Sequence, residues 1–490
     1  MSATGRPERE YPSAQHEGAP ARAGMLIRNG RIVTAGDDFL ADILVEEGRI
    51  EAIGRTLPAG PGVAVHDAAG LLVLPGAVDV HTHLDSATPT ASTVDDFAVG
   101  TRAAAFGGTT TVVDYCTPPA GAGLMAGLDD WHRRRASACV DVGAHMIVRD
   151  ADTATLAEMK PLVEREGITS FKFFMAYPGS LMLEDGALFD ALAAAGALGA
   201  LSCVHAENGP VIQRLVEAAL ARGETAPRHH ATTRPAVLEG EAAQRAIELA
   251  ALARAPLYVV HLSTAEALQA VQRARQRGQP VFAETCPQYL LLDDSVYEAE
   301  GFEGAKYVMS PPVRPASHGR ALWRGLQTGD IQSVATDHCA FTYGEEPHGL
   351  RHSKRLGLAA FNRIPNGAPG VETRLPLMHD AAVLQHGMSL NRFVDLVATA
   401  PARLFGLFPR KGTVAVGSDA DLVLFDPQER WTVRAATHHS RSDYSLFEGR
   451  PVTGRVKKVF LRGQCIVDGP QWLGREGMGQ YLPRAASGRA

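Results

Sequence analysis

The sequence has few cysteines, no excess of positive charge and no long apolar run. Its 490 residues include 6 cysteines and no C-x-x-C pair, so we expect no disulfide framework and predict a cytoplasmic location. Lys+Arg total 48 against 54 for Asp+Glu, and this net charge of -6 argues against a nucleic-acid partner. The longest apolar stretch, residues 191–201, is too short to cross a bilayer, which argues against a membrane partner.

Three polar segments are predicted to have no catalytic or binding role. Residues 1–24 are rich in Gly, Pro, Ala and charge and lack the apolar core of a secretory signal, so they are predicted to be a disordered leader. The basic clusters "HRRR" (132–135) and "GLRHSKRLG" (349–357) are interpreted as a solvated helix face and a solvated loop.

Both ends of the chain carry short β-rich segments. In "MLIRNGRIVT" and "ADILVEEGRIEAIG", Asn29-Gly30 and Glu47-Gly48 stand between apolar stretches and predict hairpin turns. A similar texture returns in "GTVAVGSDADLVLFD" and "GRVKKVFLRGQCIVDG". We therefore predict a small β-sandwich domain built from residues 25–74 and 409–470, followed by a C-terminal tail (471–490) that is a candidate subunit contact.

Residues 75–408 alternate between apolar, strand-like runs and Ala-rich helical stretches. Eight strand candidates occur there, from "GAVDV" to "IQSVATD". This alternation is typical of parallel strands covered by helices on both faces. The count favours an α/β fold of the (β/α)₈ TIM-barrel type over an open doubly wound sheet, and no G-x-G-x-x-G motif supports the alternative.

Several of these strands end in, or contain, a polar side chain. Catalytic groups of such barrels lie at the C-terminal ends of the strands, so these side chains are predicted to meet at one rim. They are His81 and His83 after "GAVDV", Lys172 in "SFKFF", His205 in "LSCVHA", His261 in "LYVVHL" and Asp337 in "QSVATD".

The spacing of His81 and His83 suits a strand, because residues i and i+2 face the same way. An isolated H-x-H pair is more often structural, but three further imidazole and carboxylate groups at the same rim favour a metal site. Imidazole and carboxylate without thiolate suit zinc, with manganese, iron, cobalt or nickel as alternatives.

Lys172 interrupts an apolar strand, and an unpaired buried ammonium is costly. The lysine could reach the barrel mouth, act as a Schiff-base nucleophile, or react with CO₂ to form a carbamate. The neighbouring histidines favour the anionic carbamate, because metal ions would repel a cation.

Longer motifs resemble the dihydropyrimidinase/hydantoinase family of cyclic-amide amidohydrolases, in order from Met25 onward. They include "GAVDVHTHLD", "FKFFMAYPG", "CVHAENG", "VVHLSTAEAL", "YVMSPPVRP", "ATDHCAF" and "IPNGAPGVETRLPLM". The resemblance implies two zinc ions bridged by a hydroxide and by N6-carboxylysine formed at Lys172 from CO₂. It implies that one ion is bound by His81, His83 and Asp337 and the other by His205 and His261.

The resemblance also implies hydrolytic opening of 5,6-dihydropyrimidines and 5-substituted hydantoins, a small-molecule cyclic-amide substrate, and a homotetramer. Asp337 would be the general base and then the general acid, and Tyr177 would stabilise the oxyanion. Ser310 and Asn366 would hold the flat edge of the substrate, mainly through backbone groups. Alternatively, Tyr177 is a covering loop aromatic, and Ser310 and Asn366 are ordinary turn residues.

Three alternatives have weaker support. Dihydroorotases place an arginine directly after H-x-H, where this chain has Leu84 followed by Asp85. Allantoinases carry a different segment where this chain has "SATPTASTVDDF". Non-catalytic dihydropyrimidinase-like scaffold proteins have lost metal ligands that this chain keeps. Residues 338–365 form a segment longer than is usual in the family, predicted to lie at the rim of the site.

Overall fold

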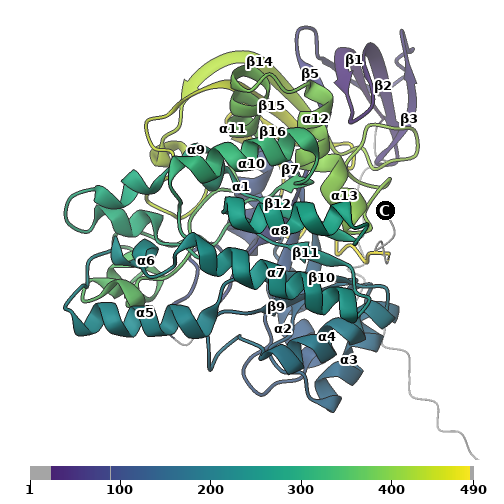
Figure 1. Cartoon of the computed structure of the whole chain (residues 1–490). Coiled ribbons are helices and arrows are strands. Elements are labelled where there is room, and N and C mark those ends of the chain that lie inside the picture. The colour runs from purple at the N-terminus through teal and green to yellow at the C-terminus, as the bar shows by residue number, and fades with distance from the viewer. Residues whose placement is uncertain (1–23, 89, 486–490) are drawn as a thin grey trace, which may run out of the picture.

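The computed structural model describes residues 24–88 and 90–485 (Figure 1). Residues 1–23 of the predicted leader and 486–490 of the predicted tail lie outside the described residues. The described chain forms an eight-stranded parallel sheet and a nine-stranded, mostly antiparallel sheet. None of its helices is long and apolar enough to span a membrane.

The parallel sheet is a nearly closed barrel whose strands pair in chain order. Its first and last strands approach through a bridge between Thr82 and His338, and Thr336 Oγ1 donates a hydrogen bond to Asp79 Oδ2 at 2.6 Å. The predicted TIM-type barrel is therefore confirmed. The strands are β6 (Ala77–Thr82), β7 (Thr109–Cys116), β8 (Asp141–Ile147), β9 (Ser170–Phe174), β10 (Leu201–His205), β11 (Leu257–Val259), β12 (Val281–Thr285) and β13 (Ser333–Val334).

Helices cover the outside of the barrel (Figure 1). Strands such as β7 are therefore buried along their whole length, as is usual for parallel sheets. Helix α8 (Ala265–Gln276) shows how the sequence forms them. Thr264 caps its first turn by accepting a hydrogen bond from Ala267 N at 3.2 Å. Its buried residues, including Leu268 and Val271, recur at helical spacing and face the strands.

The remaining helices alternate with the strands or follow them. The α-helices are α1 (Phe97–Phe106), α2 (Leu124–Arg135), α3 (Thr153–Glu164), α4 (Asp185–Ala197), α5 (Gly209–Ala221), α6 (His229–Thr232), α7 (Ala236–Leu252), α9 (Pro287–Leu291), α10 (Ala316–Thr328), α11 (Arg374–Met378), α12 (Leu390–Val394) and α13 (Ala400–Leu404). The short 3₁₀ and π segments are η1 (Asp294–Glu298), η2 (Glu303–Tyr307), η3 (Leu350–His352), η4 (Lys354–Gly357), η5 (Phe361–Arg363), η6 (His379–Gln385), η7 (Asp395–Thr399) and η8 (Ala435–Thr437).

The second sheet joins the two ends of the chain, as predicted. Strand β5 from the N-terminal part pairs antiparallel with β14 from the C-terminal part, and Leu74 lies opposite Val423. Within the described residues of this sheet, β4 and β5 run parallel to β1, and the other pairings are antiparallel. The strands are β1 (Met25–Val33), β2 (Asp38–Glu46), β3 (Arg49–Gly54), β4 (Ala64–Asp67), β5 (Leu72–Pro75), β14 (Leu422–Thr432), β15 (Pro451–Leu461), β16 (Gln464–Asp468) and β17 (Gln471–Trp472).

One of the two predicted hairpin turns is wrong. Glu47-Gly48 does connect β2 to β3, but Asn29-Gly30 lies inside β1, where the pairing register with β2 shifts. Asn29 adopts a left-handed φ of 58°, and its backbone N–H donates to Asp42 Oδ1 at 3.0 Å. A Cβ at Gly30 would lie 2.4 Å from Val73 Cγ2. The Asn-Gly pair therefore forms a bulge that brings β1 close to β5.

The interpretation of "GLRHSKRLG" as a solvated loop is also wrong in part. Arg351 is exposed, but Lys354 is fully buried, with a relative accessibility of 0%. A cluster of basic residues in the sequence does not show which of these side chains other loops bury.

The described part of the tail contacts the barrel of its own chain. Val142, at the start of β8, accepts a hydrogen bond from Leu482 N at 2.9 Å and donates one to Gln480 O at 2.8 Å. Arg484 is buried and donates to Ser170 Oγ at 2.8 Å. These residues cover the N-terminal end of the barrel. A contribution of the tail to subunit contacts stays a prediction.

Lys411 joins the barrel to the second sheet through three buried carboxylates. Its Nζ lies 2.6 Å from Asp141 Oδ2, 2.7 Å from Asp421 Oδ2 and 3.0 Å from Asp419 Oδ2. Replacing Lys411 with Met would leave these carboxylates without their shared cation, so we expect a loss of about 3–5 kcal/mol of stability.

Thermal unfolding followed by circular dichroism measures this loss. The matched control is Lys160→Met, because Lys160 forms only an exposed i,i+4 pair with Glu164 at 3.8 Å. That control should change stability by at most ~0.5 kcal/mol. Equal melting temperatures for the two variants would contradict the assigned role of Lys411.

Candidate metal centre

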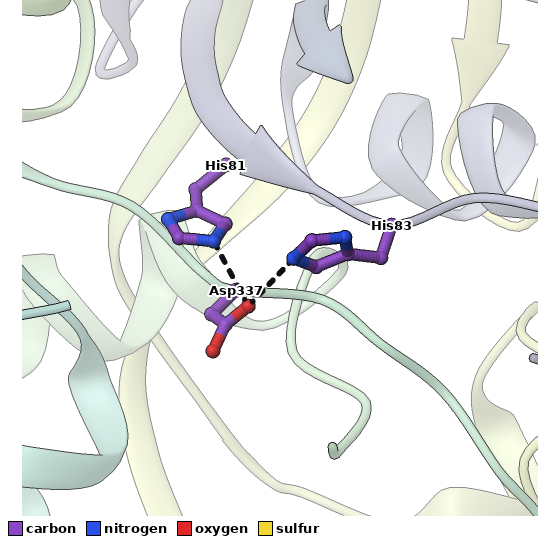
Figure 2. Close-up of side chains that lie close together, drawn as sticks. All are labelled: His81, His83 and Asp337. Carbon is purple, nitrogen blue, oxygen red and sulfur yellow. Dashed lines mark ion pairs between the residues drawn. The ribbon is translucent and has the colours of Figure 1, made fainter. Parts of the chain in front are cut away.

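The C-terminal ends of the barrel strands bring the predicted ligands together. His81 closes β6, His83 follows it, and Asp337 lies after β13 on the other side of the barrel closure. Asp337 Oδ1 lies 3.0 Å from His81 Nε2 and 3.3 Å from His83 Nε2 (Figure 2). Three ligand atoms from sequence-distant segments therefore lie within 4.8 Å of one another.

The atoms of this group have the geometry of metal ligands. His81 Nε2 is buried and makes no hydrogen bond within the described part of the chain, although Asp337 Oδ1 is close. The other ring nitrogen, Nδ1, contacts Glu284 Oε1, which orients the ring. A buried, unsatisfied nitrogen aimed at a carboxylate and a second imidazole fits a divalent cation, with Glu284 as the outer partner.

A second pair of histidines lies beside the first. The ring centres of His205 and His261 are 4.6 Å apart, and that of His261 is 5.4 Å from that of His81. His205 Nε2 lies 2.9 Å from Glu207 Oε2, which leaves Nδ1 for a ligand. His261 Nδ1 is buried and has no hydrogen-bond partner among the described residues. This pair fits a second metal ion.

Lys172 lies near both groups. The Nζ atom of Lys172 is 5.1 Å from the ring centre of Phe174, and that ring centre lies 5.4 Å from that of His205. The same Nζ is 4.8 Å from the ring centre of Tyr115, and the Tyr115 ring lies 4.7 Å from His81 and 5.0 Å from His83. The side chain is 1% exposed, and within the described residues no carboxylate forms an ion pair with it. Burial lowers the pKa of Lys172 to about 8, so about a tenth of the amine is neutral near pH 7.

When no metal is bound, burial and neighbouring charges decide the protonation of His81 and Asp337. Burial alone would lower the pKa of His81, but the charges of Asp337 and Glu284 raise it to about 9. Burial would raise the pKa of Asp337, but His81 and His83 bring it well below its usual value. Asp337 is therefore an ionised carboxylate at neutral pH, and a metal ion would compete with a proton for His81.

The predicted substrate residues come from three loops at the same rim. Tyr177 follows β9, and its ring centre lies 5.5 Å from that of His205. The side chains of Tyr177 and Ser310 share a hydrogen bond, and Ser310 Oγ donates to Asn366 Oδ1 at 3.3 Å. Burial raises the pKa of Tyr177 to about 12, so its phenol stays protonated and can donate. The three residues thus form one connected edge beside the second histidine pair.

Three site residues have a strained backbone. Tyr177, His261 and Asp337 have φ values of 65°, 39° and 53°, in the left-handed region that side-chain-bearing residues rarely adopt. Such conformations persist only where the surroundings hold them. The strain therefore marks positions where side-chain direction matters more than backbone preference.

Two carboxylates that orient the ligand histidines were missed by the sequence analysis. Glu284 is buried in β12, where it also accepts hydrogen bonds from His261 N at 3.1 Å and Tyr258 Oη at 2.9 Å. Glu207 follows His205 by two residues, and contact with that histidine, against the effect of burial, lowers its pKa to about 2. The sequence offered two signals for these carboxylates: a glutamate inside the apolar "PVFAETC", and a glutamate two residues after the histidine of "CVHAENG".

Leu84, which entered the comparison with dihydroorotases, is a core residue. It is 2% exposed, and its Cδ2 lies 2.3 Å from the position of a Cβ added at Gly100 of α1. Its side chain therefore packs on this helix.

Comparisons with known proteins agree with this arrangement. Residues 72–466 match the amidohydrolase family. A D-hydantoinase of Streptomyces coelicolor is 50% identical over 465 residues, which cover 94% of this chain and 98% of that protein. A dihydropyrimidinase of Arabidopsis thaliana is 39% identical, over 96% of this chain and 88% of that protein. The crystal structure of a dihydropyrimidinase from Brevibacillus agri superposes with a TM-score of 0.92 at 46% identity, over 95% of this chain and 100% of that one. The chain belongs to the amidohydrolase family.

Proposed function

We propose that this chain hydrolyses cyclic diamides. It opens 5,6-dihydropyrimidines to N-carbamoyl-β-amino acids and 5-substituted hydantoins to N-carbamoyl amino acids. The observation that carries the proposal is the convergence of four histidines, Lys172 and Asp337 at one barrel rim. The names of the relatives from Streptomyces coelicolor, Arabidopsis thaliana and Brevibacillus agri support this substrate class.

The donor set fits two divalent metal ions, for which zinc is the first candidate. His81, His83 and Asp337 would hold one ion, and His205 and His261 the other. When bound, the ions supply a hydroxide nucleophile at neutral pH and polarise the ring carbonyl.

Lys172 is proposed to carry a carbamate that bridges the two ions. Three features support this role: burial without a carboxylate partner, a pKa lowered to about 8 by that burial, and contact with the rings of Tyr115 and Phe174, which pack against His81 and His205. Only the neutral amine reacts with CO₂. The product is anionic and replaces a costly buried cation with a group that metal ions attract.

The other residues move protons and orient the substrate. Asp337 is ionised and so can accept the proton of the attacking hydroxide and return it to the ring nitrogen as the C–N bond breaks. Tyr177 keeps its proton and donates a hydrogen bond to the oxyanion that forms at the carbonyl. Ser310 and Asn366 hold the imide edge of the ring. Assembly into a homotetramer stays a prediction.

A substrate panel tests the proposal directly. We expect the zinc-loaded enzyme to open dihydrouracil, dihydrothymine, hydantoin and D-phenylhydantoin, with ring opening followed by loss of ultraviolet absorbance and by product chromatography. Because the Streptomyces coelicolor relative is named a D-hydantoinase, the D-enantiomer of phenylhydantoin should react faster than the L-enantiomer. Faster turnover of allantoin or dihydroorotate than of all these rings would assign the chain to a sister activity.

Replacing Lys172 with Ala removes the proposed bridge. Activity should fall by more than the roughly 10–100-fold that loss of an outer partner of a metal ligand costs. Acetate or propionate should restore part of it, because a small carboxylate can occupy the position of the carbamate. A Schiff-base lysine would not be rescued in this way, and full activity of the variant would exclude both roles.

Replacing Glu284 with Gln tests the outer partner of His81. The amide is similar in size but less basic, so zinc affinity should fall about 10–100-fold. Dialysis against graded chelator, followed by metal analysis, measures this change. Glu372→Gln is the control, because Glu372 contacts His439 at 2.8 Å and that histidine is no proposed ligand. Equal metal retention by the two variants would remove Glu284 from the metal site.

A further inference from the structure

The long segment 338–365 contains a buried lysine with an unusual set of partners. Lys354 begins η4 and has a relative accessibility of 0%. Its Nζ donates three hydrogen bonds to backbone carbonyls: to Val308 O at 2.8 Å, Pro365 O at 2.6 Å and Gly367 O at 2.6 Å. Within the described residues it forms no ion pair with a carboxylate.

The three carbonyl acceptors indicate that the lysine is protonated and positively charged. An ammonium group has three N–H donors and no acceptor, so three converging carbonyls match it fully. A neutral amine would direct its lone pair at one of the three oxygens. The ring centre of Phe341, 5.4 Å from Nζ, adds a further contact suited to a cation. Burial lowers the pKa of Lys354 to about 7, so the charge is costly here and depends on these acceptors.

The carbonyls belong to the two loops that carry the proposed substrate residues. Val308 lies two residues before Ser310, and Pro365 and Gly367 flank Asn366. We propose that Lys354 is a positioning residue that ties the Ser310 loop to the Asn366 loop and so fixes the edge that holds the planar amide face of the substrate. This inference rests on the proposed function for the identity of that substrate.

Other contacts show that the two loops form one unit. Gly367 N donates to Val308 O at 3.1 Å, so Val308 O accepts from both Gly367 and Lys354. The residue after Val308 is also held, because His230 Nε2 donates a hydrogen bond to Met309 O at 2.8 Å. Lys354 is the charged member of this unit and the only one that contacts both flanks of Asn366 within the described residues.

The tether is separate from the proposed metal ligands. His81, His83, Lys172, His205 and His261 lie on or directly after strands β6, β9, β10 and β11. Asp337 shares the segment after β13 with Lys354, but its carboxylate contacts His81 and His83, whereas Lys354 Nζ contacts Val308, Pro365 and Gly367. Loss of the lysine should therefore move the substrate edge and leave metal binding intact. This separation distinguishes a positioning role from general damage to the site.

The experiment compares Lys354→Met with two matched controls. Arg355→Met changes the next residue of η4, an exposed side chain 3.6 Å from Glu345, and Lys411→Met removes a buried lysine that joins the barrel to the second sheet. In Lys354→Met, KM for dihydrouracil and hydantoin should rise about 10–100-fold, with a smaller change in kcat and unchanged zinc content. The folded fraction of each control should keep the wild-type KM.

Hydrogen–deuterium exchange gives a readout that needs no turnover. Peptides covering 308–310 and 365–367 should exchange faster in Lys354→Met than in the wild type or in either control, while the peptide covering 81–84 should not change. If the wild type opens none of the cyclic diamides, the proposed function fails and the exchange experiment still tests the tether. Should Lys354→Met not fold, Lys354→Arg takes its place, because it keeps the charge and donors but cannot match all three carbonyls.

Each remaining outcome decides against the inference. Unchanged exchange in both loops would refute the tether. Faster exchange with wild-type KM would refute a role in substrate positioning. A higher KM accompanied by zinc loss, or the same KM rise in Lys411→Met, would show a general structural effect.

Discussion

The closure of the barrel between β6 and β13 is the contact on which the site depends. His81 lies on the first strand, His83 directly after it, and Asp337 follows the last strand, so these candidate ligands meet only because the two strands meet. The closure is polar: Thr336 N and Oγ1 donate to Asp79 at 3.2 and 2.6 Å. The buried Arg374 donates to Val78 O on β6 at 3.0 Å and to Val334 O on β13 at 2.9 Å. Hydrogen bonds have directions, so they hold the register of these strand ends more tightly than apolar packing would.

Three buried lysines show how surroundings decide what one residue type does. Lys411 lies among three carboxylates, and although burial opposes it, their charges raise its pKa. Lys354 lies among three carbonyls and Lys172 beside aromatic rings and histidines, and burial lowers the pKa of both, to about 7 and about 8. The first is a permanent cation that joins two sheets. We propose the second as a tether between loops and the third as the amine that forms the carbamate.

Much of the site could be predicted because its signals are local. The alternation of apolar runs and helical stretches predicts the barrel, and polar residues at strand ends predict a common rim. The i, i+2 spacing places His81 and His83 on one side, and both Nε2 atoms do approach Asp337 Oδ1. Glu284 and Lys354 escaped prediction because a buried glutamate or lysine is defined by its partners. His81 lies 203 residues from Glu284, and the Val308 carbonyl lies 46 residues from Lys354.

The sequence by itself determined the order of the barrel strands, the types of the side chains at the rim and the pairing of the two chain ends in one sheet. These follow from period, spacing and residue chemistry, which need no knowledge of distant contacts. Tertiary structure decided that Asn29-Gly30 is a bulge, that Leu84 packs on α1, and that one lysine of a basic cluster is buried between two loops. In each case a distant segment supplies the space or the acceptors, and the free energy of burial depends on that segment.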